Sequence, residues 1–426
     1  MKKNWLRTGQ DPVVFLTLQN GLTVNLINKP GYKQTVASLT VKFGSLTSTY
    51  QDRKGKTKTI PAGTAHFLEH KLFDKPEGDV LIKMADLGAD GNAFTSNQVT
   101  CYYLATHENL RENIELLLDF VQTPVFSEES VKRERGIIEE EIASYQDDPD
   151  SRLYQGMLRT VYPNSQLAKD IAGDAFSLQK ISSEVLYDVY HNYYRPDNMV
   201  LTVVGDLNQD QLCQWIQSNQ QAGVLTKARK ISVDFANGRP VQVRQDEEKL
   251  NVSLERIAWL GGLEMRPNRC LAEQELLAEF VLELVFGEQT DWYQSCYQEG
   301  VLGDDFDFEV SMMPGYAYVM FFSSGPRAEE QEKVIQTRLN LVEQILSEDS
   351  TDFSLLKRSL IGEKIQQQDQ LTSLALDEDL ALYGLSLFDK MNLLNQLEQR
   401  DLADYARVTF KRSQLAQFIV KKQDNG

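Results

Sequence analysis

The 426-residue chain has few cysteines, few histidines and no long hydrophobic run. Its four cysteines, Cys101, Cys213, Cys270 and Cys296, are widely spaced and form no CxxC pair, so we expect reduced thiols and no disulfide frame or thiolate metal site. No stretch approaches the roughly 20 apolar residues of a membrane span, and no apolar segment follows the basic N-terminus as in a signal peptide. These absences predict a cytoplasmic protein that is not inserted in a membrane.

Positive charge is also scarce. The chain has 44 Lys and Arg against 62 Asp and Glu, a formal net charge of −18. Nucleic-acid and membrane-surface binding are disfavoured because both need a net basic face. The charge is typical of a soluble surface, and an acidic cavity that prefers basic peptides is a second interpretation. With 42% hydrophobic residues, the chain can bury a large core, and its length predicts two or three domains.

One order of predicted elements occurs twice along the chain. Hydrophobic periodicity predicts, in the first half, strands at 13–28 and 35–43, helices at 63–73 and 79–87, a hairpin at 91–106, helices at 108–121, 128–146 and 183–194, and a strand at 199–204. The second half repeats this order, with helices at 271–286 and 291–299, strands at 305–313 and 316–323, helices at 328–347, 352–368 and 399–408, and a strand at 414–420.

Two short matches support a duplication. Residues 65–73 match residues 278–286, and residues 135–142 match residues 358–365 at a similar offset. We therefore predict an α+β fold of two homologous α/β-sandwich halves, each with a mainly antiparallel sheet packed by helices. The predicted boundaries are 1–225 for the first half, 226–245 for a linker rich in Gly, Lys, Arg and Gln, and 246–426 for the second half.

Two of the four histidines stand four residues apart in His66-Phe67-Leu68-Glu69-His70. On a helix, positions i and i+4 lie one turn apart on one face, so both imidazoles can bind a single ion. Glu69 projects about 60° from His66 and about 100° from His70 around the helix axis, beside the ion but not as its natural ligand. A zinc-bound water deprotonated by Glu69 is the expected nucleophile. The alternative, two core histidines with a surface glutamate, offers no packing reason for this pattern.

A zinc ion in a hydrolase takes a third protein ligand and keeps a fourth position open. The helix at 128–146 offers many glutamates, and a rotation of about 100° per residue places Glu134 and Glu141 on one face, with Glu139 on the far side and Glu140 at the edge. We predict Glu141 as the third ligand and Glu134 as a carboxylate that orients a histidine ring or the water. The alternative is that both are solvated helix charges.

The second half lacks this set of groups. His66, Glu69, His70 and Glu141 correspond there to Glu279, Leu282, Glu283 and Lys364. The second half therefore cannot hold a metal ion in the same way, and we expect one Zn²⁺ per chain. The remaining histidines, His107 and His191, have no spaced partner and are expected to be structural or surface residues.

These motifs resemble the insulinase/pitrilysin family of zinc peptidases, the inverzincins. The resemblance extends to Gly91-Asn92-Ala93-Phe94-Thr95-Ser96, to the segments 190–199 and 203–206, and to the doubled architecture. It implies a zinc-dependent endopeptidase in which each subunit forms half of a clamshell chamber that encloses short peptides or unfolded segments.

The resemblance also implies a role for each site residue. It makes His66, His70 and Glu141 the zinc ligands, Glu69 the group that activates water, and Glu134 a supporting catalytic residue. The strand around Asn92, Ala93 and Phe94 would bind substrate by pairing with its extended backbone.

One departure from the family concerns the substrate-holding Arg and Tyr, which members usually present from a second-half domain. The matching hairpin, residues 304–318, contains tyrosines but no arginine, and none lies between Arg269 and Arg327. The chain thus resembles the metal-bearing subunit of a bacterial two-subunit peptidase whose homologous partner supplies the Arg/Tyr pair; a homodimer is the alternative. Two other functions stay open: a non-catalytic structural or peptide-holding subunit, and a metal-regulated protein-binding module.

Overall fold

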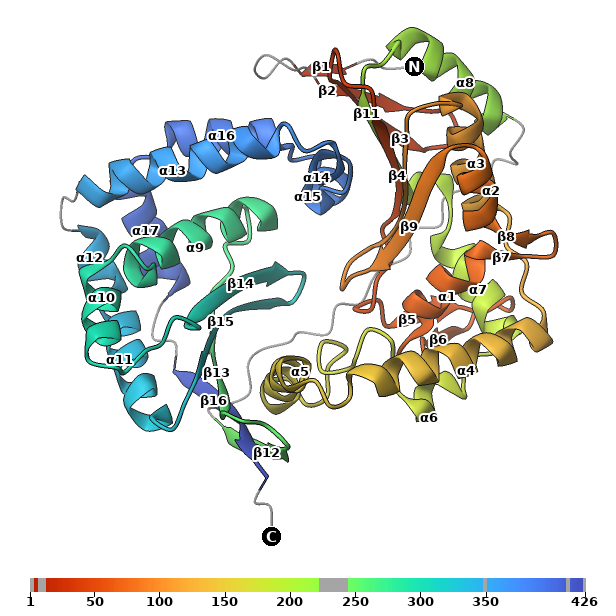
Figure 1. The fold of residues 1–426 in the computed structure, drawn as a ribbon. Helices are drawn as coiled ribbons and strands as arrows, with labels where there is room; N and C mark the ends of the chain where they lie inside the picture. Colours follow the sequence, from red (N-terminus) through yellow and green to blue (C-terminus); the bar gives the residue numbers. More distant parts are fainter. Residues whose placement is uncertain (1–3, 7–12, 222–243, 348–350, 411–413, 424–426) are drawn as a thin grey trace. The chain divides into compact units, whose positions relative to one another are not determined.

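The computed structural model describes residues 4–6, 13–221, 244–347, 351–410 and 414–423 (Figure 1). The chain divides into two compact units. Unit 1 comprises residues 1–142, 170–234 and 364–389, and unit 2 comprises residues 143–169, 235–363 and 390–426. The predicted linker at 226–245 lies outside the described residues except for its last two positions, so the predicted domain boundaries stay a prediction.

Unit 1 is built on a seven-stranded sheet with the strand order β1-β2-β3-β11-β4-β10-β9. Neighbouring strands are antiparallel except β3 and β11, which are parallel. The strands are β1 (Asn4–Leu6), β2 (Val13–Thr17), β3 (Thr23–Asn28), β4 (Thr35–Val41), β9 (Ala89–Thr95), β10 (Thr100–Thr106) and β11 (Met199–Gly205). Two small ladders pair β5 (Thr49–Gln51) with β6 (Thr57–Thr59) and β7 (Asp74–Lys75) with β8 (Gly78–Asp79).

Helices pack on this sheet and around its edges. They are α1 (Thr64–Phe73), α2 (Val80–Asp86), α3 (Leu110–Gln122), α4 (Glu128–Tyr145), α6 (Ala175–Leu178), α7 (Ser183–Tyr193), α8 (Gln209–Gln221), α14 (Leu371–Ala375) and α15 (Glu378–Tyr383). A short 3₁₀ helix, Pro196–Asn198, precedes β11.

Unit 2 contains a five-stranded sheet with the order β12-β16-β13-β15-β14. Its strands are β12 (Gln245–Leu250), β13 (Arg256–Gly262), β14 (Asp307–Met313), β15 (Tyr316–Ser324) and β16 (Leu415–Lys422). Its helices are α5 (Pro149–Val161), α9 (Leu271–Phe286), α10 (Asp291–Gln298), α11 (Ala328–Asn340), α12 (Val342–Ser347) and α17 (Gln399–Thr409). The end of α4, together with α13 (Thr351–Gln367) and α16 (Leu387–Gln396), crosses the boundary between the units.

The two sheets repeat one topology. The order β3-β11-β4-β10-β9 in unit 1 recurs as β12-β16-β13-β15-β14 in unit 2, and in each the first two strands are parallel and the others antiparallel. The matched segments of the sequence also fall on equivalent helices, α1 with the end of α9 and α4 with α13. The predicted α+β fold of two mainly antiparallel halves is confirmed.

A segment from late in the chain completes unit 1. One face of its sheet packs against α1, α3 and α7. On the other face, Val36 and Val204 pack with Leu371, Leu374 and Leu380 of α14 and α15. Ser38 of β4 donates a hydrogen bond to the Ala375 carbonyl at 2.5 Å. Burial of the second face therefore depends on residues that follow β4 by more than 300 positions along the chain.

An early segment completes unit 2 in the same manner. Helix α5 packs on β13 and β16. Gly156 permits this contact, because a Cβ atom there would lie 2.2 Å from the Phe418 ring. The sequence did not predict that residues 143–169 belong to unit 2 or that residues 364–389 belong to unit 1.

Two predicted elements differ in detail from the structure. The strand predicted at 13–28 is a hairpin of β2 and β3, and its turn uses Gly21 at φ +94°. The helix predicted at 328–347 is interrupted at Leu341 and forms α11 and α12.

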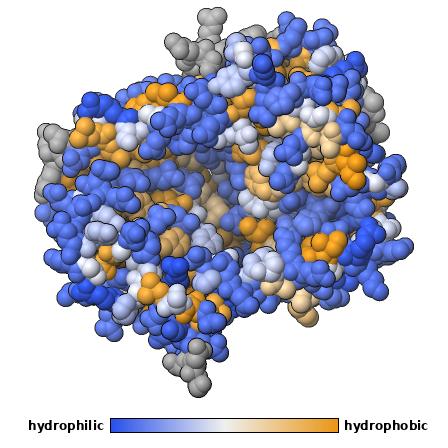
Figure 2. Space-filling view, viewed as in Figure 1, coloured by the Kyte–Doolittle hydropathy of each residue, from blue (hydrophilic) through white to orange (hydrophobic). Residues whose placement is uncertain are grey.

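The surface and the cysteines agree with the composition. Figure 2 shows a mainly hydrophilic surface with scattered hydrophobic residues, as the net charge of −18 predicts. All four cysteines are free, two of them buried and two partly buried. Within the described ranges, no helix is both long enough and apolar enough to cross a membrane.

Candidate metal centre

Helix α1 presents the two spaced histidines on the face opposite its packed side. Its apolar residues Phe67, Leu68 and Leu72 are fully buried and belong to the core of unit 1. The helix begins after Gly63, which has φ +85° and would bring a Cβ atom within 2.4 Å of the Ala172 carbonyl oxygen. A glycine is therefore needed at this position on both conformational and steric grounds.

The structure brings His66, His70 and Glu141 together. His66 Nε2 lies 3.6 Å from one Glu141 carboxylate oxygen, and His70 Nε2 lies 3.7 Å from the other. Each residue offers one ligand atom, and these atoms lie within 4.8 Å of one another. Elsewhere in the described part of the chain no comparable cluster of three His, Cys, Asp or Glu occurs. Among its described residues, unit 2 therefore has no cluster equivalent to the one in unit 1.

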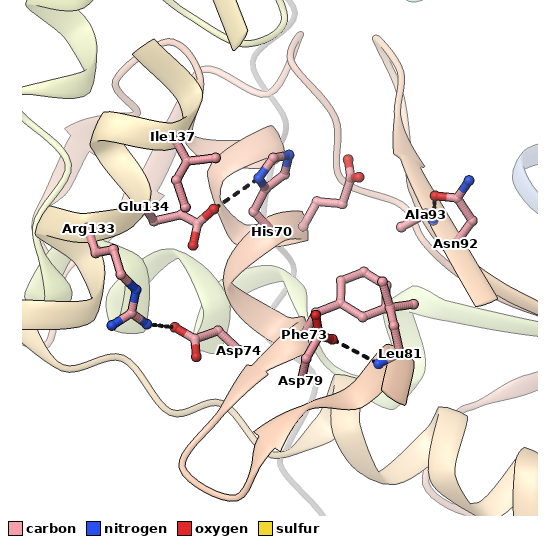
Figure 3. A pocket seen from close by; sticks show the side chains of 11 residues that line it. His70, Phe73, Asp74, Asp79, Leu81, Asn92, Ala93, Arg133, Glu134 and Ile137 are labelled. Atoms are coloured by element: carbon pink, nitrogen blue, oxygen red, sulfur yellow. Dashed lines mark hydrogen bonds and ion pairs between the residues drawn. The ribbon is translucent and has the colours of Figure 1, made fainter. Parts of the chain in front are cut away.

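Glu134 lies behind this cluster and contacts the ring of His70. Its Oε1 atom is 3.0 Å from His70 Nδ1 (Figure 3). A carboxylate accepts hydrogen bonds, so Nδ1 donates to Glu134, and Nε2, on the side of Glu141, is the nitrogen available to bind a metal ion. The equivalent nitrogen of His66, Nδ1, is buried and makes no hydrogen bond to a described residue.

The ionisation of these groups follows from burial and mutual charge. Burial, with a smaller effect of His70, lowers the pKa of His66 to about 4. Burial alone would lower the pKa of His70, but the hydrogen bond and charge of Glu134 raise it above its usual value. Burial also raises the pKa of the Glu69 carboxyl, and a hydrogen bond from Thr95 opposes this effect. His66 is therefore neutral at pH 7, the state in which imidazole binds metals.

The donor set fits a zinc ion. Two imidazole nitrogens and one carboxylate oxygen are ligands that zinc accepts in hydrolytic sites. Tetrahedral coordination with bonds of about 2.0–2.1 Å places ligand atoms about 3.4 Å apart. The separations of 3.6 Å from His66 to one Glu141 oxygen and 3.7 Å from His70 to the other are close to this value, and one atom from each residue can be chosen so that all three lie within 4.8 Å. Glu69, 8% exposed, lies beside the cluster without belonging to it.

An ionic clamp joins the end of α1 to α4. Asp74 Oδ2 contacts the Lys71 ammonium at 2.5 Å and the Arg133 guanidinium at 2.6 Å. Partial burial opposes ionisation of Asp74, but the two cations outweigh it and lower its pKa. Lys71 is fully buried, so it depends on this carboxylate. The clamp helps to set the distance between the helix of the histidines and the helix of Glu134 and Glu141.

We expect Asp74→Asn to reduce the free energy of unfolding by about 1.5–3 kcal/mol at pH 7, the range for hydrogen bonds to charged groups. Because the folded-state pKa of Asp74 is lowered, its stabilising effect is complete above the usual carboxyl pKa of about 4 and disappears as the pH falls through the lowered pKa. Urea unfolding at several pH values measures this difference, with exposed Glu77→Gln as control. Equal stabilities of Asp74→Asn and wild type at pH 7 would contradict the clamp.

A cavity of about 420 Å³ lies beside the cluster. Glu69, His70 and Phe73 of α1 line one side, and Asn92 and Ala93 of β9 line another (Figure 3). Strand β9 pairs only with β10 among the described strands and forms the edge of its sheet. The predicted substrate-binding residues Asn92, Ala93 and Phe94 thus lie on an edge strand, with Asn92 exposed and the other two partly buried.

The hairpin that matches the family's Arg/Tyr element is formed by β14 and β15. Its tyrosines Tyr316 and Tyr318 are 2% and 0% exposed. Tyr318 lies 3.2 Å from the Tyr154 hydroxyl, and Tyr316 packs edge-to-face on Tyr162. Both tyrosines are buried within unit 2.

Comparisons with solved structures define the class of fold. An M16-like peptidase from Alicyclobacillus acidocaldarius superposes with a TM-score of 0.89 at 26% identity, over 98% of this chain and 100% of that one. A protease from Helicobacter pylori has a TM-score of 0.80 at 19% identity, over 97% of this chain and 100% of that one, and shows the likeness of fold alone. The fold is that of M16-like peptidases.

Sequence comparisons give the family. The family model "Insulinase (Peptidase family M16)" matches residues 23–175, and "Peptidase M16 inactive domain" matches residues 180–360. An uncharacterized zinc protease of Bacillus subtilis, YmfH, is 30% identical over 400 residues, or 92% of each chain. The beta subunit of the mitochondrial-processing peptidase of Bos taurus is 27% identical, over 57% of this chain and 50% of that subunit. The chain belongs to the insulinase family, peptidase family M16, as the resemblance implied.

Proposed function

We propose that this protein is a zinc-dependent endopeptidase that hydrolyses short peptides or unfolded segments. The observation that carries the proposal is the convergence of His66, His70 and Glu141, with ligand atoms within 4.8 Å of one another and Glu69 beside them. A purely structural role does not require a matched set of ligands and base. Relatives named as zinc proteases support the same conclusion.

The proposed chemistry assigns a role to each side chain. When bound, a zinc ion supplies a Lewis acid that polarises the scissile carbonyl and makes water a stronger acid. Glu69 accepts the proton of the attacking water and returns it to the leaving amine. Glu134 keeps the proton of His70 on Nδ1, so that Nε2 remains a ligand.

Substrate recognition is proposed to use the edge of β9. An extended peptide can add to this edge as a further strand, which reads the main chain more than the side chains. Asn92 Oδ1 accepts a hydrogen bond from the Ala93 amide at 2.8 Å in the absence of substrate, and a bound peptide would compete for that donor. A side chain of the peptide could then enter the cavity beside His70 and Phe73.

A partner subunit is proposed to complete the site. The hairpin of β14 and β15 has no arginine, and its Tyr316 and Tyr318 are buried. We therefore infer that a homologous chain supplies an Arg/Tyr pair, either in a heterodimer or, less in keeping with the missing arginine, in a homodimer, and that the two close as a clamshell. The predicted cytoplasmic location stays a prediction.

Chelation tests the proposed function. With the full-length chain purified together with its homologous partner subunit, and a peptide library analysed by mass spectrometry, we expect cleavage that a zinc chelator reduces to background and that added Zn²⁺ restores. The far-UV circular dichroism should be unchanged, because the core of unit 1 does not include the metal ligands. Cleavage that survives complete zinc removal would refute the proposal. Zinc binding without any cleavage would favour a peptide-holding or metal-regulated binding protein.

A further inference from the structure

The carboxylate of Glu69 has one hydroxyl partner that the sequence analysis did not assign. Thr95, the last residue of β9, donates a short hydrogen bond from Oγ1 to Glu69 Oε2. Glu69 is 8% exposed, and the Thr95 side chain is partly buried. Because a hydroxyl carries a single proton, this bond commits the Thr95 donor to the carboxylate.

The turn that follows Thr95 is held by the loop after β4. The amide of Ser45 donates to the Ser96 carbonyl at 3.1 Å, and the amide of Leu46 donates to the Asn97 carbonyl at 2.9 Å. Gly44 allows this close approach, since a Cβ atom there would lie 2.6 Å from the Asn97 backbone. The end of β9 is thus supported by main-chain contacts on one side.

Helix α15 supports the same turn through two side chains. Ser96 Oγ donates to Glu378 Oε2 at 3.0 Å, and the Tyr383 hydroxyl donates to Gln98 Oε1 at 3.1 Å. The helix belongs to the late segment that completes unit 1, and its Leu380 is buried in the core on that face of the sheet. The position of the Thr95 hydroxyl therefore depends on residues from the end of the chain as well as on β9.

We propose that Thr95 is a positioning residue that holds the Glu69 carboxylate in its working orientation, and that α15 maintains Thr95 through the turn at residues 96–99. The proposal rests on the proposed function, because it concerns the base of that reaction. A glutamate side chain has several rotamers in solution, and a fixed hydrogen bond selects among them before substrate binds. Loss of the hydroxyl would spread Glu69 over orientations that do not reach the water.

The central test compares Thr95→Val with Thr95→Ser. Valine keeps the shape of threonine and removes the hydroxyl, whereas serine keeps the hydroxyl. We expect Thr95→Val to lower kcat about 10–100-fold, with KM and zinc content unchanged, because a misoriented base affects the transition state more than substrate binding. Thr95→Ser should stay within about 3-fold of wild-type kcat. Wild-type kcat in Thr95→Val, whatever its melting temperature, would overturn the proposal.

A second measurement does not depend on activity. Crystal structures of the metal-free wild type and of Thr95→Val should show Glu69 in one conformer in the wild type and in several, or in a different one, in the variant. The same single Glu69 conformer in both proteins would overturn the positioning role. If the complex of the wild-type chain with its partner subunit cleaves no peptide, the proposed function fails by that result, while this structural comparison still decides the role of Thr95.

The contribution of α15 is tested by Glu378→Leu, which removes the acceptor of the Ser96 hydroxyl. We expect kcat to fall about 3–10-fold with zinc content unchanged, less than for Thr95→Val because the main-chain contacts of the turn remain. Ser373→Ala, at an exposed position of α14, is the matched control in the same late segment. If Glu378→Leu and the control had equal kcat, α15 would have no role in maintaining the position of Thr95.

Discussion

The Glu69→Gln variant is expected to bind zinc with unchanged stoichiometry and to lose about 10²–10⁴-fold in kcat, the range for removing a general base. Glutamine preserves the shape of the side chain and the hydrogen bond that Thr95 donates, but its amide cannot accept the proton of water at neutral pH. His66, His70 and Glu141 remain in place to bind the ion. Zinc content by atomic absorption and kcat on a peptide substrate measure the two effects separately.

A matched control for this variant is Glu112→Gln, an exposed position of α3 that carries the same change in charge. It should retain wild-type zinc content and wild-type kcat. Hydrolysis at the wild-type rate by Glu69→Gln would show that another group serves as base, and loss of zinc from this variant would show that Glu69 is a ligand.

The His70→Ala variant is expected to lose both zinc and activity. The substitution removes one of the three predicted ligands and leaves Glu134 without its hydrogen-bond partner. Residues behind a metal ligand typically affect metal affinity 10–100-fold, so we expect a loss of at least about 100-fold for the ligand itself. Competition with a chromophoric chelator measures the affinity, and peptide cleavage at limiting zinc should fall to background.

The control for the histidine change is His191→Ala. His191 is an exposed histidine in the last turn of α7, outside the metal cluster. Its removal should leave zinc affinity and cleavage unchanged. If His70→Ala kept wild-type affinity for zinc, the assignment of this helix face as a metal site would be wrong, and the family membership would then describe the fold without its chemistry.

The two variants together separate chemistry from metal binding. Only substitution of the general base is expected to abolish turnover while zinc stays bound. Only substitution of a metal ligand is expected to remove both zinc and turnover. A protein in which the cluster served structure alone would show neither pattern, since turnover would be absent throughout.

Local periodicity was sufficient for the principal elements of the candidate site. The spacing of His66 and His70 depends only on the helical repeat, and the structure places both, partly buried, on the face of α1 that is turned toward Glu141. The same repeat selected Glu134 and Glu141 from the many glutamates of α4, and the structure brings both to the histidines. Glu139 instead accepts a hydrogen bond from Gln179.

Contacts between distant elements were not predictable in this way. Asp74 and Arg133 form an ion pair because α1 ends beside α4. The periodicity of a single segment cannot predict a contact between two segments. Thr95 lies in a motif that the family resemblance included, yet its bond to Glu69 depends on how β9 lies against α1. The short helices α14 and α15 lack a long amphipathic repeat, so their place on the sheet of unit 1 also escaped prediction.

The amino-acid sequence by itself determined the duplicated α+β organisation, the family, and which side chains share a face of α1 and α4, because all of these depend on order, spacing and local repeat. Only the tertiary structure decided the separations between His66, His70 and Glu141, the clamp at Asp74, the support of Glu69 by Thr95, and the exchange of segments 143–169 and 364–389 between the units. Those features arise where elements far apart along the chain pack together, and packing is set by the shapes of whole surfaces and not by any one segment.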